Sequence, residues 1–343
     1  MNTQRLDTFN EYESSIERAA EIIRNGGIVA MPTETVYGLA AAADNDKAIE
    51  KVFLAKGRPQ DNPLIVHISD MEMLKRVASS LPKAALDCAK TFWPGPFTMV
   101  LKRGDWVSDR VCAGLDTVAV RMPSDPVALD LIRAAGPLAA PSANTSGKPS
   151  PTSASHVIHD LDGKIDAVLI SSDCEVGVES TVITLATDVP RILRPGAVTY
   201  EQLHDLLGNV EIDSAVLKQM QAGEKAASPG MRYKHYAPSV ETYLVEADED
   251  AFVEYVNSVD DRVAVCFEHE AERIASPKLC YGDGENEASL AHELFDMLRS
   301  VDDMGASKVY IHAPSKSGVG LAVYNRLIRA AGFKVIKLEG SVI

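Results

Sequence analysis

The first two-thirds of the chain alternates short apolar runs with amphipathic stretches, which is the pattern of an α/β domain. Residues 13–25 carry apolar side chains at helical spacing and stop at a Gly-Gly pair, so they predict a helix. The same pattern predicts helices over residues 46–56, 71–78 and 83–91, and strands over residues 28–31, 64–68, 97–101, 117–122, 138–140, 167–171, 180–185 and 191–193.

Several of these predicted strands run into a polar turn that contains proline. The turns read AMPTET, VRMPSD, AAPSAN and ILRPG. Because proline has no N–H to donate to a central ladder, each turn marks the end of a strand. Ligand sites in open α/β sheets form from such loops, so we expect a site among them.

Residues 209–238 break the alternation. Their sequence includes QAGEKAASPGMRYKHYAPS, which is rich in Gly, Ala, Ser and Pro and is typical of a linker between domains. The same stretch holds five polar or aromatic residues in a row, from Arg232 to Tyr236. On the pattern alone, a solvated linker is the simplest interpretation.

Strands and helices alternate again after the linker. The strands are ETYLVE, VAVCF, residues 279–281, KVYIHA and KVIKLE, and the helices are residues 250–258, 287–301 and 320–330. This order predicts a small Rossmann-like parallel sheet, although Gly318 and Gly320 supply only half of a GxGxxG motif. We therefore expect a first domain over residues 1–208, a linker over 209–238 and a second domain over 239–343.

The composition agrees with two soluble globular domains. The chain has 343 residues, of which 46% are hydrophobic and 24% charged, and only 6% are aromatic, so its cores must rest on Val, Ile, Leu and Ala. The five cysteines are widely spaced, without a CxxC pair, and are expected to be reduced thiols. The sequence has neither an apolar run of membrane length nor a leader-like start, so we expect a cytoplasmic protein without a membrane partner.

The charge is uneven along the chain. The net charge of −15 argues against a protein whose main role is to wrap bare nucleic acid, because phosphate neutralisation needs a basic surface. Residues 1–208 carry −7, residues 209–238 carry +1 and residues 239–343 carry −9. An anionic ligand is therefore expected at a local group of Lys and Arg in the first two segments.

Two polar segments of the first domain could carry chemistry, although the chain lacks Walker A, GxSxG, HExxH and kinase motifs. Lys56 and Arg58 are held close together by a glycine and a proline, and two such cations suit a polyanion or a carboxylate. Residues 141–147, PSANTSG, offer hydroxyls, amides and backbone N–H groups. Those groups suit phosphate oxygens or a hydrated Mg²⁺, but the same composition also makes a plain turn.

Two arginines and two histidines of the first domain are further candidates for binding residues. Arg121 lies inside the apolar strand TVAVRMP and needs a partner, which could be a structural Asp or an anionic substrate. Arg194 ends the strand of ILRPG. His156 and His159 have no carboxylate or cysteine at metal-ligand spacing, so a structural zinc site is not expected.

Eight short strings of the sequence, taken together, are similar to those of a known family. They are PTETVYGL, KGRPQDNPLIVH, WPGPFTMVL, TVAVRMP, APSANTSGKPSPT, GVESTVI, LRPG and SPGMRYKHYAP. Each is a weak signal alone, but in this order, over nearly the whole chain, they resemble the two-domain threonylcarbamoyl-AMP synthases. The resemblance implies a YrdC-like twisted open sheet with helices, followed by a linker and a smaller Rossmann-like parallel α/β domain.

The resemblance also implies a reaction and its partners. L-Threonine, bicarbonate or CO₂, and ATP would give threonylcarbamoyl-AMP and pyrophosphate, and a separate complex would use this product to modify adenosine 37 of tRNA. Mg²⁺ would enter with ATP, without a dedicated protein site, and no stable direct binding of nucleic acid is expected.

The same carry-over assigns roles to individual residues. The catalytic residues would be Lys56, Arg58, Ser142 and Asn144. The threonine contacts would be Thr35, His67, Arg121, Ala140 through its backbone, and Ser180. The ATP contacts would be Lys56, Arg58, Asn62, Thr117, Ser142, Asn144, Ser150, Arg194 and Tyr233. An active-site lid formed by the linker would include Tyr233, His235 and Tyr236.

Other functions remain open on the sequence. An RNA-binding module of YrdC-like fold is one alternative, against which the net charge counts. A carbamoyl-transfer relative is another, but it would need acylphosphatase and zinc-finger segments, for which this chain has neither the length nor the Cys pairs. The second domain could stabilise the first, or it could bind a partner in tRNA modification.

Overall fold

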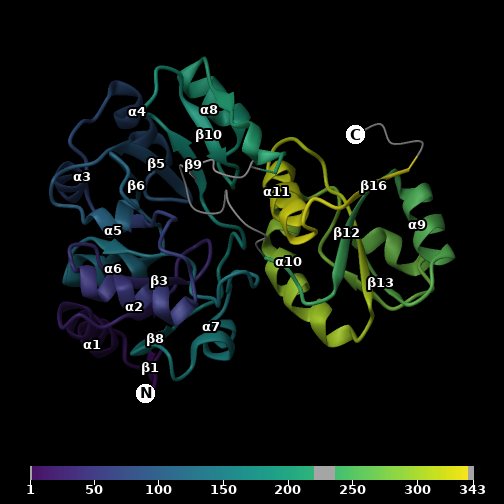
Figure 1. Ribbon diagram of the computed structural model, residues 1–343, viewed down its shortest axis with the longest axis horizontal. Helices are drawn as coiled ribbons and strands as arrows, with labels where there is room; N and C mark the ends of the chain where they lie inside the picture. Colours follow the sequence, from purple (N-terminus) through teal and green to yellow (C-terminus); the bar gives the residue numbers. More distant parts are fainter. Residues whose placement is uncertain (1, 220–235, 339–343) are drawn as a thin grey trace.

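The computed structural model describes residues 2–219 and 236–338, and it contains two α/β domains (Figure 1). Within these residues, the first domain is built on an eleven-stranded mixed sheet and the second on a five-stranded parallel sheet. Helices α10 and α11 of the second domain lie on the side that faces the first (Figure 1). The expected α/β class, with one large sheet and a smaller parallel sheet, is confirmed.

The strands of the large sheet follow the order β1-β8-β2-β3-β7-β4-β6-β5-β9-β10-β11. Their bounds are β1 Gln4–Asp7, β2 Val29–Met31, β3 Gly38–Ala42, β4 Ile65–His67, β5 Phe97–Lys102, β6 Thr117–Arg121, β7 Leu138–Ala139, β8 Ala167–Ile170, β9 Thr181–Thr184, β10 Arg191–Arg194 and β11 Glu211–Ile212. The helices of this domain are α1 Tyr12–Arg24, α2 Asp46–Lys56, α3 Met71–Val77, α4 Lys83–Phe92, α5 Asp109–Cys112, α6 Pro126–Ala135, α7 Ala154–Leu161 and α8 Tyr200–Leu207.

Strand β11 changes the expected division of the chain. Glu211 and Ile212 pair with Arg191 and Ile192 of β10, so the first sheet continues into the segment that was expected to be linker. Apolar contacts favour this extension, because Ala215 packs in the same buried cluster as Leu193. Residues 220–235, which include the Arg232–His235 run, lie outside the described residues.

The central strands bring predicted site residues together by register. His67 of β4 is paired directly with Arg121 of β6, and Thr98 of β5 is paired with Arg121 from the other side. Cross-strand partners share a face of the sheet, and alternate residues along a strand do so as well. Ile65, His67 and Arg121 therefore present their side chains on one face, which the site occupies.

The second domain is the expected Rossmann-like parallel sheet. Its strands, in the order β14-β13-β15-β12-β16, are β12 Glu241–Glu246, β13 Arg262–Cys266, β14 Lys278–Cys280, β15 Lys308–His312 and β16 Val335–Lys337. Its α-helices are α9 Glu249–Ser258, α10 Glu287–Ser300 and α11 Gly320–Ala330. The five cysteines all lie in the described ranges and are free thiols. In those ranges, no helix combines the length and the apolar character that crossing a membrane requires.

Candidate active site

One cavity lies against this face of the large sheet, and most of the predicted site residues line it. Those in the lining are Lys56, Arg58, His67, Arg121, Ala140, Ser142, Asn144, Ser180, Arg194 and Tyr236. They come from strands, from loops that follow strands, and from the end of α2. These residues are spread over nearly two hundred positions of the sequence, and the fold brings them together around one cavity.

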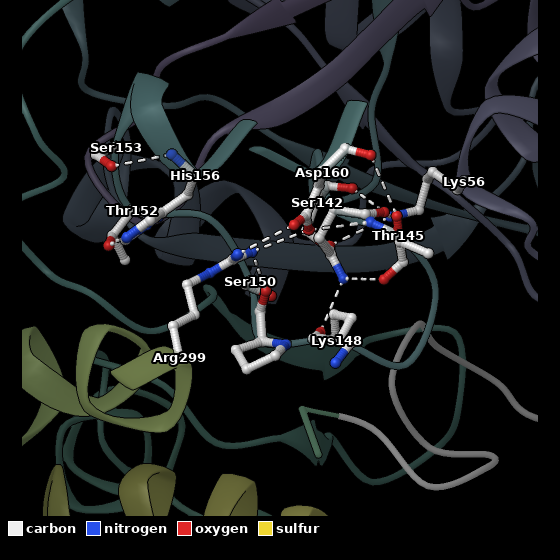
Figure 2. A network of polar contacts seen from close by, with 12 residues as sticks. Lys56, Ser142, Thr145, Lys148, Ser150, Thr152, Ser153, His156, Asp160 and Arg299 are labelled. Atoms are coloured by element: carbon white, nitrogen blue, oxygen red, sulfur yellow. Dashed lines mark hydrogen bonds and ion pairs between the residues drawn. The ribbon is translucent and has the colours of Figure 1, made fainter. Parts of the chain in front are cut away.

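Lys56 anchors one side of the cavity. It is the last residue of α2, because Gly57 turns into the left-handed conformation with φ 62° and ends the helix. The buried Nζ of Lys56 donates to the carbonyl oxygens of Ser142 (2.5 Å) and Asn144 (2.7 Å). Burial, together with repulsion from Arg58, lowers the pKa of Lys56 well below its usual range. Figure 2 shows Lys56 reaching into the loop that carries Ser142 and Thr145.

The loop that Lys56 holds, residues 142–148, is organised by its own hydrogen bonds. The hydroxyl of Ser142 donates to Oδ1 of Asn144 (2.6 Å). Nδ2 of Asn144 donates to the carbonyls of Thr145 (2.9 Å) and Lys148 (2.8 Å). The loop is therefore set before any ligand arrives, which is the condition for catalysis by positioning.

Positive charge concentrates in the cavity. The pKa of Arg58 is lowered to about 10, mainly by burial and also by nearby Arg194, against the opposing effects of Tyr236 and Asp61. The Nε of Arg58 is buried without a hydrogen-bond partner among the described residues. The cations that line the cavity are Lys56, Arg58, Arg121, Lys148 and Arg194, whereas Glu179 is the one carboxylate among the described lining residues. Such a cavity favours an anionic ligand.

Arg121 has a structural carboxylate partner, which the sequence left open. Its NH2 lies 2.7 Å from Oε1 of Glu34, and both side chains are buried. Its NH1 donates to Oγ1 of Thr35 (2.8 Å). The pair is close but poorly aligned, since neither Glu34 oxygen has a hydrogen bond within the described structure. Glu34 was missed because a carboxylate in the turn PTET looks solvated in sequence.

His67 and Ser180 complete the wall around Arg121. Burial, with repulsion from Arg121, lowers the pKa of His67 to about 3, so the ring is neutral at physiological pH. The hydroxyl of Ser180 lies 2.8 Å from that of Thr98 and accepts a hydrogen bond from NH2 of Arg194 (3.2 Å). A neutral imidazole and a fixed hydroxyl can both hydrogen-bond an uncharged substrate group.

Four predicted contact residues lie outside the lining that the described residues form. Thr35 is fully buried and accepts a hydrogen bond from Arg121, and Ser150 donates to Oε1 of Glu179 (2.6 Å). Asn62 is buried, with no hydrogen-bond partner for its Oδ1 in the described ranges. Thr117 starts β6, four residues and about 13 Å along the strand from Arg121. Their ligand contacts stay predictions.

The predicted lid is described at one residue only. Tyr236 lines the cavity, is 6% exposed and packs its ring against Phe295 of α10 at 5.2 Å between centroids. The next residue, Ala237, donates its N–H to the carbonyl of Gly147 (3.0 Å). Tyr233 and His235 lie outside the described residues. The end of the linker is therefore in contact with the cavity loop.

Comparisons with known proteins cover nearly the whole chain. Residues 21–196 match the family model described as Telomere recombination, and residues 198–332 match that of the threonylcarbamoyl-AMP synthase C-terminal domain. The threonylcarbamoyl-AMP synthases of Bacillus subtilis and Pyrococcus abyssi are each 43% identical, over 96% and 95% of this chain and 97% and 96% of their own. The crystal structure of P. abyssi Sua5 complexed with L-threonine is 40% identical, with a TM-score of 0.89, and covers 99% of this chain and 100% of that one.

Proposed function

The chain belongs to the family of two-domain threonylcarbamoyl-AMP synthases, and we propose that the cavity at Lys56, Arg58 and Arg194 carries out the reaction of that family. The substrates are L-threonine, bicarbonate or CO₂, and ATP, and the products are threonylcarbamoyl-AMP and pyrophosphate. The threonine complex of P. abyssi Sua5 supports the amino-acid substrate. The excess of cations over carboxylates in the cavity lining is the observation that supports the nucleotide.

The chemistry requires no nucleophile from the protein. The neutral amine of threonine attacks CO₂ and loses a proton, which gives a carbamate. A carbamate oxygen then attacks the α-phosphorus of ATP, and the bond to the leaving pyrophosphate breaks. Both steps depend on alignment and on stabilisation of negative charge, which a preorganised loop and buried cations supply.

The residues divide between the two substrates by their chemistry. Arg58 and Arg194 would contact phosphate oxygens, while Arg121 would hold the threonine carboxylate in competition with Glu34. Thr35, His67 and Ser180 are the candidates to bind the threonine hydroxyl. A site that hydrogen-bonds that hydroxyl rejects valine more strongly than one that reads shape alone.

Mg²⁺ would arrive on the triphosphate. Glu179, the carboxylate of the described lining, is already paired with Arg326, so neutral oxygens such as those of Ser142 and Asn144 are the hard donors left for the ion. That set fits an ion held mainly by phosphates and water. When bound, the ion would neutralise charge on the leaving pyrophosphate.

The direct test is release of pyrophosphate by the purified chain with ATP, Mg²⁺ and bicarbonate. We expect release with L-threonine, and much less with serine, valine or no amino acid. Removing Mg²⁺ with EDTA should abolish it. Equal release with all amino acids would refute the substrate, and release unaffected by EDTA would refute the role of Mg²⁺.

We propose that the product passes to a separate complex that modifies adenosine 37 of tRNA, and that the reaction takes place in the cytoplasm. The net charge of −15 favours transfer of the product to a separate complex over direct binding of RNA by this chain. Salt-sensitive affinity for tRNA in a filter-binding assay would instead support the RNA-binding alternative.

A further inference from the structure

The second domain inserts a buried arginine between two loops of the cavity. Arg326 of α11 is fully buried, and its Nε donates to Oε2 of Glu179 (3.0 Å). Its NH2 donates to the backbone carbonyl of Glu179 (3.1 Å), and its NH1 donates to the carbonyl of Pro195. One guanidinium therefore ties together the GVES and LRPG segments.

These two segments carry residues that face the ligand cavity. Ser180 follows Glu179 and precedes β9, and Arg194 ends β10, which is antiparallel to β9. Arg194 donates from Nε to the carbonyl of Ser180 (3.1 Å) and from NH2 to its hydroxyl (3.2 Å). The distance between the predicted threonine and ATP contacts thus depends on how the two loops are held.

A second arginine of the same domain contacts the segment around the loop that Lys56 holds. Arg299 of α10 contacts both carboxylate oxygens of Asp160, at 3.1 and 3.0 Å, and donates to the carbonyl of Pro149 (2.6 Å). Asp160 in turn accepts the N–H of Thr145 (3.2 Å), next to Asn144 in the loop held by Lys56. Figure 2 shows Arg299 reaching Asp160 from outside that loop.

We propose that Arg326 and Arg299 are positioning residues, through which the second domain sets the geometry of the catalytic cavity in the first. The planar fork of arginine can span a side chain and two carbonyls, which a lysine ammonium cannot do with the same geometry. The proposal rests on the proposed function, because its main readout is threonine-dependent release of pyrophosphate.

The substitutions Arg326→Gln and Arg299→Gln test it. With Arg326 replaced, Glu179 keeps Arg194 as a neighbouring cation, and attraction between them would draw Arg194 away from its ligand position. A displacement of about 1 Å can cost on the order of 100-fold in rate, so we expect kcat/KM to fall about 10- to 100-fold. Arg326→Lys keeps the charge but loses the fork, and should recover only part of the activity.

A matched control separates positioning from stability. Tyr324 lies on the same helix as Arg326, is 3% exposed, and donates its hydroxyl hydrogen to Oε1 of Glu246 (2.6 Å), away from the cavity lining. Tyr324→Phe should lower the melting temperature but leave KM and kcat nearly unchanged. Rates are compared at a temperature where circular dichroism shows each variant to be folded.

The double variant Glu179→Gln, Arg326→Gln keeps the test decisive if Arg326→Gln folds poorly. It removes the carboxylate that would attract Arg194, so it should fold and regain part of the kcat/KM lost in Arg326→Gln. The inference is overturned if both arginine variants match Tyr324→Phe in kcat/KM, or if Arg326→Lys is fully active. Absence of pyrophosphate release from the unsubstituted chain would instead refute the proposed function, and this inference with it.

Discussion

Lys56→Met examines the buried ammonium group that holds the cavity loop. Methionine keeps the length of the side chain but removes the charge and every N–H donor. The carbonyls of Ser142 and Asn144 would then lose their donor from Nζ, at a position that is 2% exposed. We expect both a less stable first domain and a displaced loop.

The magnitude follows from two opposing effects. A buried carbonyl that loses its partner costs about 1–3 kcal/mol, so two of them cost about 2–6 kcal/mol. Against this, the substitution relieves the desolvation of the ammonium, the same burial that lowers the pKa of Lys56. We therefore expect a net loss of about 2 kcal/mol, near the lower end of that range.

Urea unfolding followed by tryptophan fluorescence measures this loss in the first domain, because the two tryptophans, Trp93 and Trp106, both lie there. Lys51→Met is the control, since Lys51 lies on the same helix, is exposed, and donates to the carbonyl of Gly26 (2.6 Å). Its free energy of unfolding should change by less than about 0.5 kcal/mol. The reasoning fails if the two variants unfold at the same urea concentration and turn over substrate equally.

Two further predictions concern the charged pairs of the site. Arg121→Lys keeps a cation but cannot contact Glu34 and Thr35 together, so the KM for threonine should rise about tenfold while the KM for ATP stays constant; equal rises in both would contradict this. Burial alone would raise the pKa of Glu179, but Arg326 and Arg194 lower it to about 2, below its ordinary value of 4.5. Its ionised form therefore stabilises the fold above about pH 4.5, and this contribution is lost as the pH falls towards 2. Glu179→Gln should unfold at a urea midpoint that depends less on pH between 5 and 3, and an unchanged dependence would contradict the pairing.

Local patterns predicted the elements that carry their own signals. The helix expected over residues 46–56 is α2, because Asn45 caps its start by accepting the N–H of Ala48 and Gly57 ends it. Strand β3, Gly38–Ala42, was not predicted, since GLAAA has no β-branched residue and is strand only through its neighbours in the sheet. Helix α6 was missed as well, although Asp125 caps it and Pro126 begins it.

The sequence predicted which types of residue form the site, but it predicted less well which residues contact one another. Lys56 and the PSAN loop stood out as polar groups beside apolar segments, and the fold brings them into contact. The carboxylates that organise the site did not stand out. Glu179 is paired with Arg326, 147 positions away, and a pairing so distant leaves no trace in local sequence. The acidic second domain therefore gave no hint that two of its arginines reach the cavity.

That arrangement offers a physical reason for the second domain to exist. The proposed reaction forms no covalent intermediate with the protein, so its rate depends on holding an amino acid and a nucleotide in line. Small displacements of either substrate therefore lower the rate strongly. Loops at strand ends are the more mobile parts of a fold. Two parts of this cavity are each held by a guanidinium group from the second domain. One guanidinium contacts Glu179 and the other contacts Asp160. A charge in the second domain can thus control the cavity without touching a substrate, which is why substitutions at Arg326 and Arg299 should reduce turnover more than substitutions elsewhere in the interface.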